Sequence, residues 1–89
     1  MADSPQLTIY TLELCPNCEL LKEYLKGHGI PYQERDLSTA ESLTELRING
    51  IFVSEAPVLQ NGDHFLTTHE LFSGGHVRED NVTQLLAGE

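Results

Sequence analysis

The sequence Cys15-Pro16-Asn17-Cys18 places two thiols at the start of a helix-like segment, directly after a strand-like run. They are the only two cysteines among the 89 residues. At a helix N-terminus, unpaired backbone N–H groups favour the thiolate form of the first thiol, and the thiolate is the nucleophile of disulfide exchange. Pro16 suits the first helical position because an N–H there would have no intrahelical partner. The motif predicts a redox-active pair, with Cys15 attacking and Cys18 resolving.

Three other interpretations of the cysteines fit the sequence less well. Structural zinc normally takes four Cys or His ligands, whereas this chain has one Cys-x-x-Cys unit and four scattered histidines. A structural disulfide at this spacing would close almost no loop, so it would remove little entropy from the unfolded chain. Two unrelated buried thiols would not explain a proline at the helix start. We expect no bound metal or other cofactor.

Two hypotheses from another class stay open. In the first, the cysteines of two chains share a zinc ion or an iron–sulfur cluster, and the protein carries metal. In the second, the chain is a binding module that keeps the fold without its chemistry. The intact pair of thiols argues against this second hypothesis.

Composition limits the remaining possibilities. The chain has 14 acidic and 5 basic side chains, a formal net charge of −9, so a nucleic-acid partner is disfavoured. The acidity fits either a basic docking surface on a partner or simple solubility. With 39% hydrophobic residues we expect one domain over residues 1–89. Without a long apolar run or a secretory signal, we expect a cytoplasmic monomer that does not enter a membrane.

Strand and helix periodicities alternate along the chain. Residues 7–12 are rich in β-branched and apolar side chains and predict a strand. From residue 16 to about 26 the period is helical, with Cys18, Leu21 and Leu25 on one stripe and a charged, solvated face opposite. The further expected elements are a strand at 31–37, a helix from a capping box at 38–41 to 49–50, a hairpin of 57–60 and 64–66 around Asn61-Gly62, a helix capped at 67–70 and ended by Gly74-Gly75, and a final helical turn or two around 82–86.

Together these features resemble the thioredoxin fold in its minimal, glutaredoxin-like form, over residues 7–86. The resemblance implies an α/β fold of order βαβαββα, with a four-stranded mixed sheet flanked by helices. It also implies that the Ala56-Pro57 bond is cis and lies against the redox pair, with the backbone of Ala56 bonding an extended substrate peptide. Besides catalytic Cys15 and Cys18, the expected substrate-binding residues are Pro16, Asn17, Ala56, Pro57, Thr67 and Thr68.

The chain departs from glutathione-dependent glutaredoxins at several positions. Those proteins typically carry a lysine three residues before the first cysteine and an aromatic residue between the two, where this chain has Leu12 and Asn17. Their Gly-Gly-x-Asp segment, which holds the glutamyl end of glutathione, is replaced around residues 66–70. Thr67 or Thr68 is left to offer a helix-start backbone to a carboxylate. The departures disfavour glutathione as the specific reductant.

Residues 49–59 resemble the segment that small redoxins carry around their cis proline. Such redoxins pass electrons to ribonucleotide reductase and are reduced by thioredoxin reductase. We therefore expect a dithiol–disulfide oxidoreductase that reduces protein disulfides, with ribonucleotide reductase as a candidate acceptor and a thioredoxin-reductase-type flavoenzyme as donor. A glutathione-dependent glutaredoxin is the alternative. His69 is interpreted as a surface residue, with tuning of Cys15 as its alternative role.

Overall fold

The computed structural model describes residues 7–52, 55–62 and 64–87. Three stretches on which sequence expectations fell lie outside the described residues, namely Met1–Pro5, part of the redoxin-like segment (Val53 and Ser54), and the end of the chain after Ala87.

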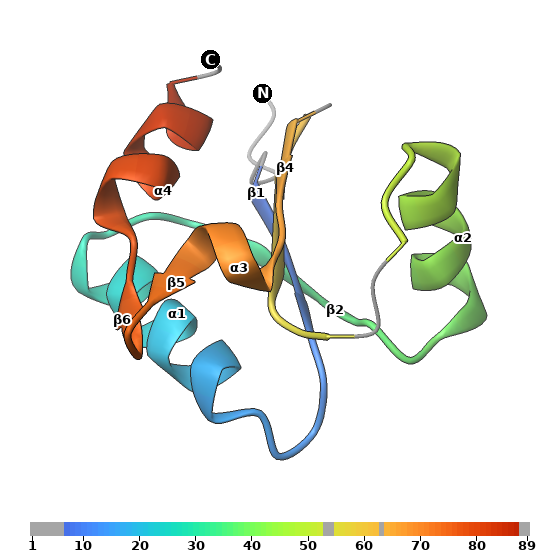
Figure 1. Cartoon of the computed structure of the whole chain (residues 1–89), viewed down its shortest axis with the longest axis horizontal. Coiled ribbons are helices and arrows are strands. Elements are labelled where there is room, and N and C mark those ends of the chain that lie inside the picture. Colours follow the sequence, from blue (N-terminus) through green and yellow to red (C-terminus); the bar gives the residue numbers. More distant parts are fainter. Residues whose placement is uncertain (1–6, 53–54, 63, 88–89) are drawn as a thin grey trace.

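A mixed four-stranded sheet of order β2-β1-β3-β4 lies at the centre of the molecule (Figure 1). β1 (Leu7–Thr11) pairs parallel with β2 (Gln33–Asp36) and antiparallel with β3 (Val58–Asn61). β3 in turn pairs antiparallel with β4 (His64–Leu66) across the Asn61-Gly62 turn. The α/β fold, the mixed sheet and the hairpin expected from the sequence are confirmed.

Helices cover both faces of this sheet. α1 (Pro16–Gly27), α3 (Thr68–Leu71) and α4 (Glu79–Leu86) lie on one side, and α2 (Ala40–Ile48) lies on the other (Figure 1). α4 matches the expected final helix of about two turns. None of the helices in the described ranges is long and apolar enough to cross a bilayer.

The central strand β1 supplies both cores because successive side chains of a strand point to opposite faces. Ile9 belongs to the larger core and its neighbour Tyr10 to the smaller one. The larger core is completed by Leu7, Leu21, Leu25, Leu59, Leu71, Val82 and Leu85. The smaller core is completed by Leu37, Leu46 and Val58. α1 thus rests on the sheet through Leu21 and Leu25, which are fully buried on the same stripe as Cys18.

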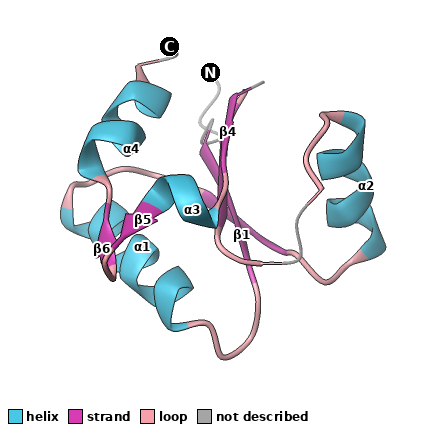
Figure 2. Ribbon diagram, viewed as in Figure 1, coloured by secondary structure: helices cyan, strands magenta, loops and turns pink. Residues whose placement is uncertain are grey.

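The expected helix end at Gly74-Gly75 is wrong. α3 stops at Leu71, and the chain forms a second, two-stranded sheet of β5 (Phe72–Ser73) and β6 (His76–Val77), which lies beside α1 and α3 (Figure 2). Gly74 and Gly75 have φ of 59° and 81°. Two consecutive residues of positive φ make the tight turn of a hairpin, so the glycine pair joins two strands here.

The start of α2 is one residue later than expected, because Thr39 and not Ser38 is the N-cap. The hydroxyl of Thr39 accepts a hydrogen bond of 3.1 Å from the backbone N–H of Ser42. Ser38 is engaged elsewhere, since its N–H and its hydroxyl both donate to the carboxylate of Asp36, at 2.8 and 2.7 Å. These bonds lower the pKa of Asp36. The aspartate at the end of β2 therefore shifts the cap by one position.

Candidate active site

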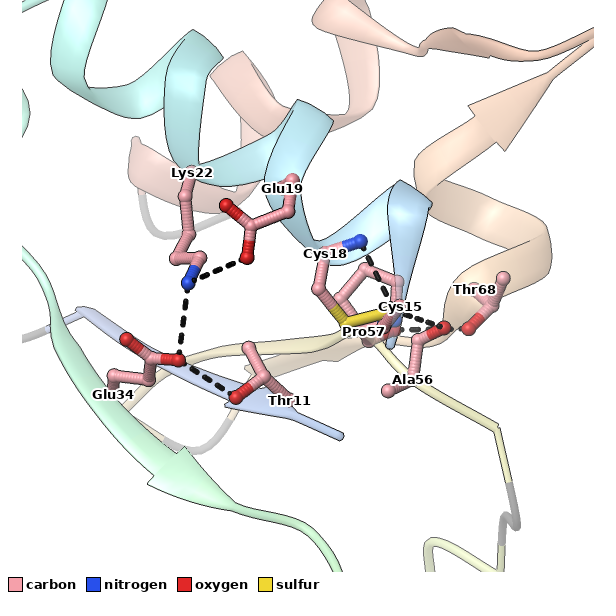
Figure 3. Close-up of a disulfide and its surroundings, with 9 residues drawn as sticks. All are labelled: Thr11, Cys15, Cys18, Glu19, Lys22, Glu34, Ala56, Pro57 and Thr68. Atoms are coloured by element: carbon pink, nitrogen blue, oxygen red, sulfur yellow. Dashed lines mark hydrogen bonds and ion pairs between the residues drawn. A yellow bond between two sulfur atoms is a disulfide. The ribbon is translucent and has the colours of Figure 1, made fainter. Parts of the chain in front are cut away.

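A disulfide joins Cys15 and Cys18 at the N-terminus of α1 (Figure 3). Cys15 is the N-cap residue, with an extended backbone (φ −115°, ψ 96°), and Pro16 opens the helix. The backbone N–H of Cys18 donates to Sγ of Cys15 at 3.1 Å. The sulfur thus accepts the bond that a side-chain oxygen accepts in an ordinary N-cap. The helix start expected from the sequence is confirmed, and the N–H of Cys18 points at the first sulfur.

The two cysteines differ in exposure. Cys18 is 1% exposed and packs in the helix face that rests on the sheet. Cys15 is half-buried, and its neighbours Pro16 and Asn17 are exposed and half-buried. A molecule approaching from solvent therefore meets the sulfur of Cys15 first.

The Ala56–Pro57 peptide bond is cis, as the family resemblance implied. The carbonyl oxygen of Ala56 lies 3.7 Å from Sγ of Cys15, so the loop before β3 touches the disulfide (Figure 3). Pro57 is buried, and the hydroxyl of Thr68 donates a 3.0 Å hydrogen bond to its carbonyl oxygen. The first residue of α3 therefore ties this loop in place beside the cysteines.

The start of α3 is occupied by a carboxylate of the chain itself. Glu70 accepts a hydrogen bond of 2.9 Å from the backbone N–H of Thr67 and one of 3.2 Å from its hydroxyl. The capping signal at Thr67–Glu70 is confirmed. Thr68 contacts the cis-proline loop through Pro57 and Thr67 bonds Glu70, so the bonds described for the two threonines are internal. Their substrate-binding role stays a prediction.

An open hollow of about 380 Å³ borders Cys15. We call it the Cys15 hollow, and its lining residues are Leu12, Glu13, Leu14, Cys15, Pro16, Asn17 and Ala56. Four of the predicted site residues (Cys15, Pro16, Asn17 and Ala56) therefore share one surface, whereas Cys18 and Pro57 lie buried behind it.

Sequence reasoning missed two residues of this surface, Glu13 and Leu14, and Leu14 is the less expected of the two. Its side chain is 100% exposed, and its backbone has φ of +54°, in the left-handed region that non-glycine residues rarely adopt. A glycine or an asparagine would have signalled such a conformation, but a leucine gives no such signal.

A second unexpected feature is an ion-pair network one turn beyond Cys18. Nζ of Lys22 lies 3.0 Å from Glu19 and 3.3 Å from Glu34, and its side chain is only 17% exposed. The hydroxyl of Thr11 donates to the same oxygen of Glu34 at 2.8 Å (Figure 3). The hydrogen bond from Thr11 is the main cause that lowers the pKa of Glu34, and the one to Glu19 is the main cause that raises the pKa of Lys22. Lys22 therefore bridges α1 to the sheet and does not belong to a freely solvated face.

His69 is exposed at the surface. Its Nε2 lies 3.6 Å from a carboxylate oxygen of Glu55, and both side chains are largely exposed, at 88% and 61%. The contact joins α3 to the loop before Ala56. The geometry fits the interpretation of His69 as a surface residue.

Comparison with known proteins agrees with this geometry. The glutaredoxin family model matches residues 7–65. An N-acetyl-S-hydroxy-L-cysteine reductase from Bacillus subtilis is 31% identical over 62 residues, which is 70% of this chain and 67% of the relative. The chain belongs to the glutaredoxin family.

Several solved structures share the fold of this glutaredoxin-family chain. The NrdH-redoxin of Escherichia coli, described as a glutaredoxin-like protein with a thioredoxin-like activity profile, has a TM-score of 0.58 and 26% identity, covering 68% of this chain and 79% of its own. A glutaredoxin from Archaeoglobus fulgidus has a TM-score of 0.63 and 20% identity, covering 94% and 88%. The thioredoxin-like protein BC3987 has a TM-score of 0.69 and 21% identity, covering 94% and 97%.

Family and geometry together define the chemistry of this glutaredoxin-family member. A Cys-x-x-Cys pair closes a disulfide at a helix start, with one sulfur accessible and the other buried. The family model is that of glutaredoxins, and the relative from Bacillus subtilis is named a reductase. The protein is a thiol–disulfide oxidoreductase whose redox group is the cysteine pair itself.

Proposed function

We propose that this protein reduces disulfides of other proteins, with Cys15 as the attacking thiolate and Cys18 as the resolving thiol. The observation that carries the proposal is the difference between the two sulfurs. Sγ of Cys15 accepts the helix-start N–H of Cys18 at 3.1 Å and borders an open hollow, whereas Cys18 is 1% exposed. Hydrogen bonding to a thiolate favours the charged form, and burial disfavours it.

The reaction proceeds in two exchanges. The Cys15 thiolate attacks one sulfur of the substrate disulfide, which forms a mixed disulfide and releases the first substrate thiolate. Cys18 then loses its proton and attacks Sγ of Cys15, which releases the second substrate thiolate. The released thiolates take up protons, and the two electrons of the cysteine pair now reside in the reduced substrate. The protein is left in the oxidised form described above.

The substrate is an extended segment that lies over the Cys15 hollow. The backbone of Ala56 is the proposed partner for its main chain, because Ala56 lines the hollow and its carbonyl oxygen is 3.7 Å from the reactive sulfur. Pro16 and Asn17 line the same hollow. Pro57 fixes the direction of Ala56, and Thr68 holds Pro57 through its carbonyl oxygen.

The proposed electron donor is a thioredoxin-reductase-type flavoenzyme and not glutathione. Leu12 and Asn17 replace the lysine and the aromatic residue of glutathione-dependent relatives, and Glu70 already bonds the backbone N–H of Thr67. The thioredoxin-like activity profile described for the Escherichia coli redoxin supports the same choice. Ribonucleotide reductase is the proposed acceptor, on the resemblance of residues 49–59. The setting is a reducing cytoplasm, where a lone Cys-x-x-Cys pair is more often catalytic than structural.

Coupled NADPH oxidation tests this proposal. Insulin supplies the disulfide, and thioredoxin reductase is compared with glutathione plus glutathione reductase at equal protein concentration. We expect faster turnover with thioredoxin reductase, and its loss in Cys15→Ser. Saturable turnover with glutathione, together with none with thioredoxin reductase, would contradict the donor assignment. An ultraviolet–visible spectrum of freshly purified protein, with metal analysis, separates this function from that of a metal carrier shared by two chains.

A second candidate comes from the reductase relative, whose name describes a small S-hydroxycysteine as its substrate. The same cysteine pair would suit such a reaction. The Cys15 thiolate attacks the S–OH sulfur, water leaves with the uptake of one proton, and Cys18 resolves the mixed disulfide. Turnover of N-acetyl-S-hydroxy-L-cysteine without turnover of insulin would favour this candidate over protein reduction.

A further inference from the structure

We propose that the surface around Cys15 selects disulfides carried on cationic segments that bear an apolar side chain beside the cystine. The inference rests on the proposed reduction of protein disulfides and specifies which protein segments react best. It starts from the charges and the apolar side chains that surround the Cys15 hollow.

Two carboxylates neighbour the lining of the Cys15 hollow, and one of them, Glu55, also contacts His69. Glu13 lines the Cys15 hollow two residues before Cys15, and exposed Glu55 directly precedes Ala56. None of the residues that line the hollow is a lysine, arginine or histidine. A cationic segment would therefore approach an acidic rim without meeting a positive charge among the lining residues.

None of the five basic side chains lines the Cys15 hollow itself, although Lys22 and Arg35 line a neighbouring hollow that shares Leu12, Glu13 and Leu14 with it. Lys22 pairs with Glu19 and Glu34, and Arg78 pairs with Asp80. The remaining three belong to the end of α1, to β2 and to the end of α2, namely Lys26, Arg35 and Arg47. With a net charge of −9, the long-range field of the protein has the same sign as the rim of the Cys15 hollow. Complementary charge raises the rate of encounter, and like charge lowers it.

Leu14 supplies the apolar part of the surface. Its side chain is fully exposed, so it adds nothing to either core, and its φ of +54° is unfavourable for a leucine. A residue that serves neither burial nor backbone geometry, at the edge of a reactive site, points to use by a partner. Leu14 shares the hollow with Pro16 and Ala56, which continue the apolar surface up to Cys15.

The occupant is therefore a segment of a different, basic protein. A second copy of this chain would bring two acidic rims together in a symmetric contact, and repulsion between like charges opposes that contact. Small anionic disulfides, which carry carboxylates near the sulfur, meet the same repulsion. A lysine- or arginine-rich segment gains attraction and can place an apolar side chain on Leu14.

Single-turnover kinetics with matched peptides tests the selection without any electron donor. Three disulfide-linked peptides of equal length are offered to the pre-reduced protein, one with lysines and a leucine beside the cystine, one with lysines and a serine, and one with glutamates and a leucine. At low ionic strength we expect the lysine–leucine peptide to react at least tenfold faster than the glutamate peptide. The ratio should shrink in 0.5 M salt, because salt screens exposed charges.

Variants assign the selection to this surface. Glu13→Gln with Glu55→Gln should lower the ratio of cationic to anionic rates several-fold. Each rim substitution is also made singly, and the control Glu23→Gln, which removes one charge from the exposed face of α1, should change the ratio far less than either single substitution. Ratios are compared because a change in the reactivity of Cys15 affects all peptides alike. Leu14→Asn should slow the lysine–leucine peptide more than the lysine–serine peptide.

The outcomes separate the two proposals. If no peptide is reduced, the proposed function fails. If all three react at equal rates that do not depend on salt, the protein is a disulfide reductase but the selection is absent. If Glu23→Gln lowers the ratio as much as Glu13→Gln or Glu55→Gln alone does, net charge and not this surface is responsible, and the inference is overturned.

Discussion

The backbone N–H of Cys18 donates a hydrogen bond of 3.1 Å to Sγ of Cys15. The residue whose own sulfur is buried thus presents its amide to the sulfur that faces solvent. When the disulfide is reduced, the same amide favours a thiolate on Cys15, while burial favours a neutral thiol on Cys18. One turn of helix therefore assigns different tasks to two chemically identical side chains.

Replacing each cysteine by serine separates these tasks. We expect Cys15→Ser to abolish turnover, because the accessible nucleophile is lost. Cys18→Ser should keep the first exchange and accumulate a mixed disulfide with the substrate, which intact-protein mass spectrometry detects. Alkylation of the reduced wild type below neutral pH should modify Cys15 first. Preferential modification of Cys18 would reverse the assigned roles.

Removing the hydroxyl of Thr11 tests the network beneath the helix. Thr11 is 7% exposed, and its bond to Glu34 is the main cause that lowers the pKa of this carboxyl. We expect Thr11→Val to reduce the unfolding free energy of the oxidised protein by about 1 kcal/mol at pH 7, the value of a modest hydrogen bond at a partly exposed carboxylate. Urea unfolding followed by circular dichroism measures it.

The effect of Thr11→Val should also depend on pH. A carboxyl whose pKa is lowered in the folded state contributes stability above its unfolded pKa, and the contribution is lost as pH falls through the folded pKa. The difference between wild type and Thr11→Val should therefore be full near neutral pH and shrink below about pH 4.5, the ordinary range of glutamate. A difference that stays constant down to pH 3 would show that the cost comes from packing alone.

Leu14→Asn should stabilise the protein although it removes an apolar side chain. Leu14 is fully exposed, so no burial is lost, and asparagine tolerates the left-handed backbone better than leucine. We expect a gain of about 0.5–1 kcal/mol in unfolding free energy. Leu20→Asn is the matched control. Leu20 is 42% exposed within α1, where asparagine is a poorer helix former, so the same substitution should destabilise. Equal effects at both positions would remove the argument from backbone conformation.

Gly75→Ala should destabilise the small sheet of β5 and β6. No atom lies within 4 Å of the position where a Cβ would be added, so the cost comes from the backbone, whose φ is 81°. We expect a loss of about 1 kcal/mol. Gly27→Ala is the control, because this site is equally open and ends α1 without a positive φ. Alanine there should be neutral or stabilising. Thermal unfolding of both variants gives the comparison.

Most of the fold follows from local sequence signals. β1, α1 and the Asn61-Gly62 hairpin were predictable because each rests on a short pattern that its own residues satisfy. The cis bond before Pro57 came from the family resemblance and not from the residues alone. The position of Cys15 at the N-cap was predictable because Pro16, the next residue, suits the first helical position.

The features that the sequence did not predict depend on partners distant in sequence, or on backbone conformations that no residue type in the sequence indicates. Lys22 was placed on a solvated face because its partner Glu34 lies on another element, and helical periodicity cannot show it. Gly74-Gly75 suits a helix end as well as a hairpin turn, and only the pairing of Phe72 with Val77 decides between them. Leu14 adopts a conformation for which leucine is a poor choice.

The carboxylate of Glu70 accepts a hydrogen bond from the N–H of Thr67, so it competes with any carboxylate from solution for that N–H. The two groups are tethered within one turn, and a short tether corresponds to an effective concentration of about millimolar or more. A free carboxylate that approached the start of α3 would have to displace the tethered one and not simply fill a vacancy. Dissolved anions at micromolar levels therefore leave the start of α3 unchanged.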